Sequence, residues 1–495
     1  MDAEGWRFRT PIPSYILTRW LFLRLLGLIY LIAFASLLPQ ITGLIGANGI
    51  LPIANYLTAV HANYGTDAYR LLPTLAWLNS SDTFLQFLCL GGILASISVI
   101  AGLLTAPALA LCWIFYLSLT VAGQVFLGYQ WDALLLEVGF LAIFFAPLQI
   151  LPRLYKQTEP PRLILWAFRL LLFRLMFGSG VVKLASGDPN WANLTALTYH
   201  YYTQPLPTPL AWYAYQLPLW FQQVSVLIMF IVELCAPFLI FARRRRIRFI
   251  GAGAIVLLQI LILLTGNYTF FNWLTIALCI LLLDDDFLRY WLPKRLINSL
   301  KVEPKALPRW RRIIIAPIAV LIFFLGGLQI AGLFLSPRLL PGINVLSFTS
   351  PFRLVNHYGL FAIMTTTRLE IVVEGSNDGQ HWQAYTFAYK PGDLNRPPPW
   401  IAPLQPRLDW QMWFAALGSA GQNPWFSSFM QRLLEGSPDV LSLLESNPFP
   451  DAPPRYIRAE SFWYTFTDAA TRSKTSAWWS SRPAAEYFPV SSLSG

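Results

Sequence analysis

The residues of this sequence best suited to chemistry are ionisable side chains at or near the ends of long apolar runs, chiefly Lys183, His200 and Asp132. Burial disfavours the charged form of a lysine, so a desolvated Lys183 could act as a general base. A lysine at the end of a membrane span can equally extend its ammonium outward and anchor the helix. We treat Lys183 as a candidate base and keep the anchor as the alternative.

His200 and Asp132 complete the candidate catalytic set. His200 lies in the stretch 199–207, which is rich in polar and aromatic residues and has no Lys or Arg. Its imidazole could carry protons near neutral pH, or it could hydrogen-bond to the loop backbone as a structural residue. Asp132 opens an apolar run and is the candidate acid nearest to the outer ends of the spans.

Other charges inside the apolar runs are expected to pair with one another, because an isolated charge is costly in a membrane. They include Glu137, Arg174 and Glu233. Asp132 and Glu137 are separated by about 1.4 helical turns, so their carboxylates lie on different faces and do not form one acid–base site. We expect Glu137 to form a buried ion pair with Arg174, and Asp132 to find a separate cation.

Motifs of soluble enzymes are absent from the sequence. It has no nucleophile elbow, Walker loop, dinucleotide-binding glycine pattern or His-Glu-x-x-His zinc motif. The four cysteines form no Cys-x-x-Cys pair. We therefore expect no metal site, and the sequence leaves the cofactor unknown.

Membrane-spanning helices must position these residues. The chain is 56% hydrophobic and 12% charged, whereas soluble proteins are about 25% charged. A helix crosses a bilayer with about 20 apolar residues. Runs of this kind occupy 16–38, 84–104, 107–127, 131–151, 162–184, 219–242, 248–265, 270–283 and 312–335. Residues 1–335 are thus predicted to form a polytopic α-helical membrane bundle of about nine spans, with 270–283 short enough to be re-entrant.

The distribution of positive charge predicts an orientation. The loops expected on one side, 1–15, 105–106, 152–162, 243–248 and 284–312, hold 18 Lys and Arg. The opposite loops, 39–83, 128–130, 185–218 and 266–269, hold only Arg70. Because Lys and Arg accumulate in cytoplasmic loops, we expect a cytoplasmic N-terminus.

The chain's net charge of +11 does not indicate a nucleic-acid partner. Residues 336–495 carry 12 Lys+Arg and 12 Asp+Glu, so the excess lies entirely in the membrane part. Membrane lipids are the expected partners there.

Residues 336–495 are predicted to form a small extracytoplasmic β-rich domain with inserted helices. Two alternating segments, 369–374 and 381–387, flank an Asp-Gly turn and predict a hairpin. A third strand is expected at 456–466. Two helices are expected at 410–417 and 425–434.

Several long motifs resemble the lipase maturation factor family. They are 129–137, 172–184, Gly187-Asp-Pro-Asn-Trp191, 195–209, Gly266-Asn-Tyr-Thr-Phe-Phe-Asn272 and 458–466. The loop residues that carry the resemblance are Asp188, Trp191, Tyr199, Asn267 and Asn272. The resemblance covers most of the chain and implies a membrane-bound maturation or folding factor for exported or luminal proteins, with a client such as a lipase.

A fainter similarity links Gly180, Lys183, Leu184 and Trp191 to the membrane domain of the vitamin K-dependent gamma-carboxylases. It implies an alternative function, a membrane enzyme that uses a lipid-soluble cofactor such as a quinone, with Lys183 as base. This hypothesis predicts a lipid-accessible cavity beside Lys183. The folding-factor hypothesis instead predicts a client surface formed by 185–218 and the domain after 336.

The resemblance also bears on the location of the protein. Animal members of the family reside in the endoplasmic reticulum, but this sequence carries no retention tail for that compartment. We therefore expect a bacterial inner membrane, or the endoplasmic reticulum membrane in a eukaryote. In either membrane the prediction is a multi-pass protein.

Overall fold

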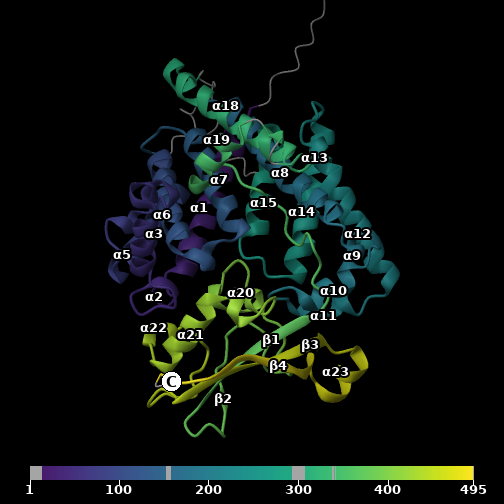
Figure 1. Cartoon of the computed structure of the whole chain (residues 1–495). Coiled ribbons are helices and arrows are strands. Elements are labelled where there is room, and N and C mark those ends of the chain that lie inside the picture. Colours follow the sequence, from purple (N-terminus) through teal and green to yellow (C-terminus); the bar gives the residue numbers. More distant parts are fainter. Residues whose placement is uncertain (1–13, 152–157, 292–306, 337–338, 341, 494–495) are drawn as a thin grey trace, which may run out of the picture.

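A bundle of helices packs against a C-terminal sheet domain in the computed structural model (Figure 1). The structure describes residues 14–151, 158–291, 307–336, 339–340 and 342–493. The membrane bundle and the β-rich domain with helices, both predicted from the sequence, are confirmed.

Seven helices of the described chain are long and apolar enough to cross a membrane. They are α1 (Ile16–Leu37), α5 (Asp82–Ala101), α6 (Thr105–Ala122), α8 (Arg162–Ala185), α12 (Leu219–Leu234) with α13 (Ala236–Leu239), α14 (Arg245–Thr265) and α18 (Arg309–Ala331). The two remaining predicted runs hold shorter helices, α7 (Gln130–Phe145) and α15 (Phe271–Ile280). Every predicted span therefore contains one of these helices.

Helices α7 and α15 both end before the predicted apolar runs 131–151 and 270–283 do. Helix α7 stops at Phe145 because Ala146, which precedes Pro147, adopts an extended conformation. Helix α15 is followed by a turn that brings Asp284 to the start of α14, where its carboxylate lies 2.9 Å from Arg245. The segment after α14 thus returns to the end of the bundle at which α14 begins.

Short helices cover the ends and flanks of the bundle. They are α2 (Ile41–Ile45), α3 (Ile53–Tyr64), α4 (Ala68–Leu71), α9 (Pro189–Ala192), α10 (Ala196–Thr203), α11 (Pro209–Tyr215), α16 (Asp285–Trp291) and α19 (Ile343–Thr349). Helices α9 to α11 form the connection between α8 and α12, next to the sheet domain (Figure 1).

The two ends of the bundle gather different loops. At one end, the Ser14 hydroxyl lies 2.8 Å from a carboxylate oxygen of Glu159 and 2.8 Å from one of Asp285. At the other end, Gln40 and Asn267 each donate a 2.9 Å hydrogen bond to a backbone carbonyl of the sheet domain. Loops predicted to share a side of the membrane therefore share an end of the bundle. Parts of the predicted cytoplasmic segments 1–15, 152–162 and 284–312 lie outside the described residues.

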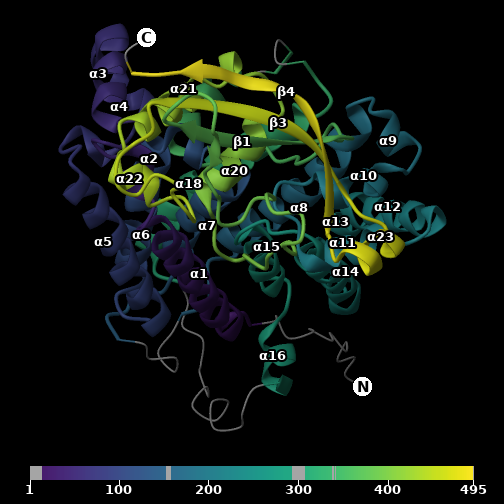
Figure 2. The same ribbon diagram turned by 90° about the horizontal axis from the view of Figure 1, so that it is seen from below.

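The C-terminal domain is built on an antiparallel sheet of order β2-β1-β3-β4. Its strands are β1 (Arg368–Ser376), β2 (Gln383–Ala384), β3 (Tyr456–Phe466) and β4 (Trp479–Ser491). Figure 2 shows β3 and β4 running as a long curved pair across the bundle. Between the sheet and the bundle lies α20 (Arg407–Ala415), and α21 (Pro424–Leu434), α22 (Pro438–Leu441) and α23 (Ala469–Thr475) complete the domain.

The sheet departs from the prediction at both edges. The second predicted strand, 381–387, is reduced to the two paired residues of β2. Strand β4 is not among the predicted strands, and it contains Pro483 and Pro489, which are uncommon in strands. Proline is tolerated in β4 because this strand lies at the edge of the sheet and its free side needs no donor.

A non-helical segment, residues 353–367, runs along α7 and α8 and joins the bundle to β1. Backbone at membrane depth needs internal hydrogen-bond partners. The Asn356 N–H donates to Glu137 at 2.9 Å, and the Gly359 N–H donates to Gln130 at 3.0 Å. Side chains of α7 thereby hold this connecting segment in place.

Candidate functional site

A cavity of about 530 Å³ lies inside the bundle beside Lys183. Its walls come from α8, α12, α14 and α15, and α10, α11 and residues 360–361 close the end near the sheet domain. Most of the lining side chains are apolar. The volume falls within the roughly 300–1,000 Å³ range of small-molecule sites.

The cavity reaches the outer surface of the bundle between α12 and α14. Three of its lining residues, Phe221, Leu261 and Leu264, are 39%, 51% and 40% exposed. Leu261 and Leu264 belong to α14, and Phe221 belongs to α12. Because both helices are candidate membrane spans, this part of the opening lies on the flank of the bundle. Tyr213 and Leu217, which are 51% and 40% exposed, extend the opening towards the connection between α8 and α12.

Lys183 is held at the cavity wall by a buried ion pair. Its Nζ lies 2.7 Å and 2.8 Å from the two carboxylate oxygens of Glu233, and both side chains are 7% exposed. The ammonium also lies 5.5 Å from the centre of the Trp191 ring. Both carboxylate oxygens of Glu233 are thus engaged by the Lys183 ammonium. The cavity predicted by the enzyme hypothesis is present, but Lys183 has the geometry of a structural charge.

His200 also lines the cavity and is neutral at physiological pH. Burial, with a smaller contribution from the charge of Lys183, lowers the pKa of His200 to about 4. Tyr268 donates its hydroxyl proton to Gln204 Oε1 at 2.9 Å, and its oxygen lies 3.0 Å from His200 Nε2. His200 Nε2 must therefore carry the proton of the imidazole. This leaves Nδ1 as an unprotonated acceptor, and it has no partner among the described residues.

Asp132 lies away from the cavity. Of the three candidate catalytic residues, the structure therefore brings only Lys183 and His200 to the same cavity. Its carboxylate accepts two hydrogen bonds from Arg407, at 2.7 Å and 2.9 Å, and a further one from the Tyr116 hydroxyl. Arg407 begins α20 in the C-terminal domain, 275 positions along the chain. Asp132 is thus a contact between the two domains.

Glu137 and Arg174 lie together at the middle of the bundle. Arg174 Nη1 is 2.7 Å from Glu137 Oε1, and both side chains are buried. Glu137 also accepts from the Tyr358 hydroxyl at 2.8 Å, while Arg174 donates to the Asn356 carbonyl at 2.6 Å. The pair therefore fixes the connecting segment 353–367 as well as two helices.

The family-motif residues after α8 contact the connecting segment 353–367 closer to β1. Asp188 caps α9 through Asn190 and accepts a 2.5 Å bond from the Met364 N–H. Burial raises the pKa of Asp188, but these hydrogen bonds outweigh it and leave the pKa below its ordinary value. Trp191 Nε1 donates to the Phe361 carbonyl at 3.0 Å. Tyr199 packs against the neighbouring apolar clusters.

Asn267 and Asn272 have different environments although one motif contains both. Asn267 is 2% exposed, and all its polar atoms are used: it donates to carbonyls of both domains and accepts from the Ile401 and Ala402 N–H groups. Asn272 is 1% exposed and lines the cavity. Its Nδ2 donates to Gln259 at 2.7 Å, but its Oδ1 has no partner among the described residues.

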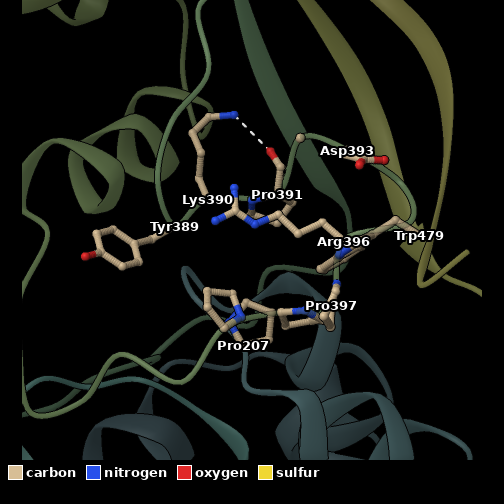
Figure 3. Close-up of a pocket in the computed structure, with 11 residues that line it drawn as sticks. Pro207, Tyr389, Lys390, Pro391, Asp393, Arg396, Pro397 and Trp479 are labelled. Carbon is tan, nitrogen blue, oxygen red and sulfur yellow. Dashed lines mark hydrogen bonds between the residues drawn. The ribbon is translucent and has the colours of Figure 1, made fainter. Parts of the chain in front are cut away.

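Arg368 provides a second charged contact between the domains. Its guanidinium donates to the carbonyls of Tyr202, Gln204 and Pro205 on the bundle and to Glu370 on β1. Figure 3 shows the adjacent contact, where Lys390 donates to the Pro391 carbonyl. The space there measures about 10 Å³, which is room for about one water molecule. The joint is therefore tightly packed beside Lys390, whereas a cavity of about 360 Å³ remains between the bundle and α20.

The sequence did not identify several of these partners. Arg407 resembles an ordinary charge of a polar domain, and no local pattern connects it with Asp132. Glu233 stands out as a charge within a span, but its partner depends on how α8 and α12 pack. No cluster of three or more His, Cys, Asp or Glu suited to a metal ion occurs among the described residues.

The fold and the site define a class: a multi-pass membrane protein whose C-terminal sheet domain is locked onto one end of its helical bundle. Two family models match this chain, the lipase maturation factor transmembrane domain over residues 17–290 and the lipase maturation factor C-terminal domain over residues 354–489. The chain belongs to the lipase maturation factor family. The predicted domain boundary at 335/336 lies between the two matches and stays a prediction.

Individual relatives agree with the family models. Lipase maturation factor 2 of Gallus gallus is 38% identical over 96% of this chain and 81% of its own length. The Homo sapiens protein of that name is 36% identical over 96% and 83%. Lipase maturation factor 1 of Mus musculus is 35% identical over 97% and 88%. No solved structure matches.

The comparisons also bear on two of the expectations from the sequence. The three relatives named above are animal proteins and lend no support to a bacterial inner membrane. None of these family members is named as an enzyme, so the enzyme alternative gains no support either.

Proposed function

We propose that this chain is a membrane-embedded maturation factor whose client is an exported lipase. The observation that carries the proposal is the similarity to lipase maturation factors 1 and 2 over nearly the whole chain, including both domains. The test is co-expression with a lipase in animal cells that lack their own maturation factors. Lipase activity per mass of secreted lipase should rise; no rise from a correctly inserted protein would refute the proposal.

The locked joint supports a rigid client platform. Asp132–Arg407 and the contacts of Arg368 fix the C-terminal domain on the bundle, so the loops of this end and the domain present one preformed surface. We place the client contact at a cavity of about 360 Å³ between the bundle and α20. Two apolar residues on its rim, Ile363 and Leu417, are 72% and 51% exposed. Exposed apolar surface of this kind suits an incompletely folded client.

A matched pair of double variants tests this contact. Ile363→Asp with Leu417→Asp should lower the gain in lipase activity at least about fivefold, because it places charges where apolar client segments would bind. Val490→Asp with Leu493→Asp is the control, since these residues are 51% and 59% exposed but lie at the end of the sheet domain. Equal activity of the two double variants would exclude the rim as the client contact.

For orientation, we propose a cytoplasmic N-terminus and an extracytoplasmic C-terminal domain, in the endoplasmic reticulum membrane of a eukaryotic host. The excess of Lys and Arg in one set of loops supports this orientation. Cysteines introduced at the exposed positions Ser481 and Arg244, in a background without the exposed Cys235, would report it. A membrane-impermeant maleimide added from the cytoplasmic side should label only the Arg244→Cys protein. Labelling of only the Ser481→Cys protein would show the opposite orientation and contradict the proposal.

A further inference from the structure

We propose that the cavity beside Lys183 is a binding site for a neutral lipid that carries a hydroxyl group, such as a diacylglycerol, and that the lipid enters from the bilayer. The proposal does not depend on a lipase client. It rests on the charge balance of the cavity, on its unpaired polar atoms and on the position of its opening.

The charge balance of the cavity favours a neutral ligand. Lys183 and Glu233 are the only Lys, Arg, Asp or Glu side chains among the described residues that line it. They neutralise each other at 2.7 Å. A charged headgroup would have to break this pair or remain without a counter-ion in an apolar environment, and both are costly. His200, the remaining titratable group beside the pair, is neutral at physiological pH because burial lowers its pKa to about 4.

The unpaired polar atoms of the cavity favour a ligand that donates a hydrogen bond. Gln259 Nε2 faces the sulfur of Met176 at 3.8 Å, and sulfur can only accept, so Gln259 Oε1 must face Asn272 Nδ2. This order leaves Asn272 Oδ1 as the free atom, in a residue that is 1% exposed.

His200 Nδ1 is the second free acceptor. The contact with Tyr268 places the imidazole proton on Nε2, which leaves Nδ1 unprotonated and without a partner among the described residues. Buried acceptors without partners are unfavourable, so both free atoms would gain from the same chemistry. A hydroxyl group supplies the missing donor, whereas an ester or a ketone does not.

The shape of the cavity favours a lipid over a water-soluble ligand. Its opening includes a gap between α12 and α14, where Phe221, Leu261 and Leu264 are exposed on the flank of two candidate membrane spans. At the end near the sheet domain, Trp191 and Phe361 are joined by a hydrogen bond and close the wall. A ligand that arrives laterally would place its apolar body among the aliphatic and aromatic side chains and its headgroup near Asn272.

Photolabelling of the full-length protein in nanodiscs tests the proposal. The probe is a photoreactive, clickable diacylglycerol, and the matched control probe is the same molecule with its free hydroxyl acetylated. We expect the hydroxyl probe to label peptides of α12 and α14. The acetylated probe should label them about tenfold less, which is the scale of one lost hydrogen bond to a buried acceptor.

Two variants and one control assign the labelling to the cavity. Asn272→Leu removes one of the two free acceptors and should reduce the preference for the hydroxyl probe. Ser179→Phe fills the cavity and should reduce labelling by both probes at least fivefold. Val320→Phe adds the same ring on an exposed face of α18, 68% exposed, and should leave labelling unchanged.

Three outcomes would overturn the proposal. They are equal labelling by both probes in the natural protein, labelling that Ser179→Phe does not reduce while the variant elutes as a monodisperse protein, and the absence of labelled α12 and α14 peptides. If Asn272→Leu does not fold, the comparison of the two probes and the Ser179→Phe variant still decide the matter.

Discussion

The joint between the domains and the cavity beside Lys183 both contain buried polar groups, but they use them differently. At the joint, Asp132, Arg407 and Asn267 have their hydrogen-bonding atoms engaged by partners from the other domain. In the cavity, Asn272 and His200 each keep one free acceptor. The space beside Lys390 is about 10 Å³, against about 530 Å³ in the cavity beside Lys183, although the joint also holds a cavity of about 360 Å³ next to α20.

This difference separates two roles for polar residues in one membrane protein. The charges and amides that are paired across the joint specify how the domains meet, because an alternative arrangement would leave them unpaired. Groups that keep a free atom beside open volume are suited to a ligand. The family motifs contribute to both places, since Asn267 lies at the joint and Asn272 at the cavity.

The largest expected effect is at the joint. Arg407→Ala leaves Asp132 buried without its cation and should destabilise the protein by about 3–5 kcal/mol. The control is Arg396→Ala, which breaks an ion pair with Glu445 whose side chains are 39% and 41% exposed; its effect should be about 0–1 kcal/mol. Thermal unfolding and protease resistance of the C-terminal domain measure both. Similar losses for the two variants would mean that the joint is not held by this pair.

A smaller effect is expected at the cavity wall. Lys183→Met leaves the Glu233 carboxylate unpaired and should cost about 3 kcal/mol. Adding Glu233→Gln removes the stranded charge and should restore most of the thermal stability and of the maturation activity. If the double variant is folded but inactive, Lys183 has a chemical role that the ion pair does not explain.

Asn267→Ala should cost about 2 kcal/mol, because it leaves the Ile401 and Ala402 N–H groups without their acceptor. The matched control is Asn193→Ala, which changes an exposed asparagine in a loop at the same end of the bundle. Thermal unfolding of the two proteins gives the comparison. Equal melting temperatures would show that the hydrogen bonds of Asn267 do not stabilise the joint.

The smallest expected effect is the pH dependence of His200. Its pKa in the folded protein is about 4, below the value of about 6.5 in an unfolded chain. The unfolded state therefore binds more protons below pH 6.5, and stability falls as the pH is lowered from about 6.5 towards 4. Between pH 7 and pH 5.5 the contribution is about 1 kcal/mol.

The variant His200→Gln isolates this contribution, because an amide can still donate to Tyr268 but does not titrate. The melting temperature of the variant should fall less than that of the natural protein over the same pH range. Parallel curves would show that His200 titrates normally and is not buried beside Lys183.

Sequence and structure agreed most closely where a pattern is local. The apolar runs predicted the spans because each crossing needs its own stretch of apolar residues, and alternation predicted β3 at its observed bounds. Patterns with conflicting signals were less informative. Strand β4, which contains two prolines, was not predicted. The sequence of segment 353–367 gave no sign that it lies along α7 and α8.

The sequence by itself determined that this chain is a multi-pass membrane protein, which of its loops share a side, and which family it resembles. These properties depend on composition, on the position of charges along the chain and on motifs, all of which are local. The sequence predicted the pair Glu137–Arg174, which the structure contains, but the tertiary structure alone decided the partners of Lys183 and Asp132. Lys183 could have met Glu137 or Glu233, and Asp132 is satisfied by Arg407, 275 positions away. Burial makes these pairings strong, but only the packing of helices and the docking of the C-terminal domain bring the partners together.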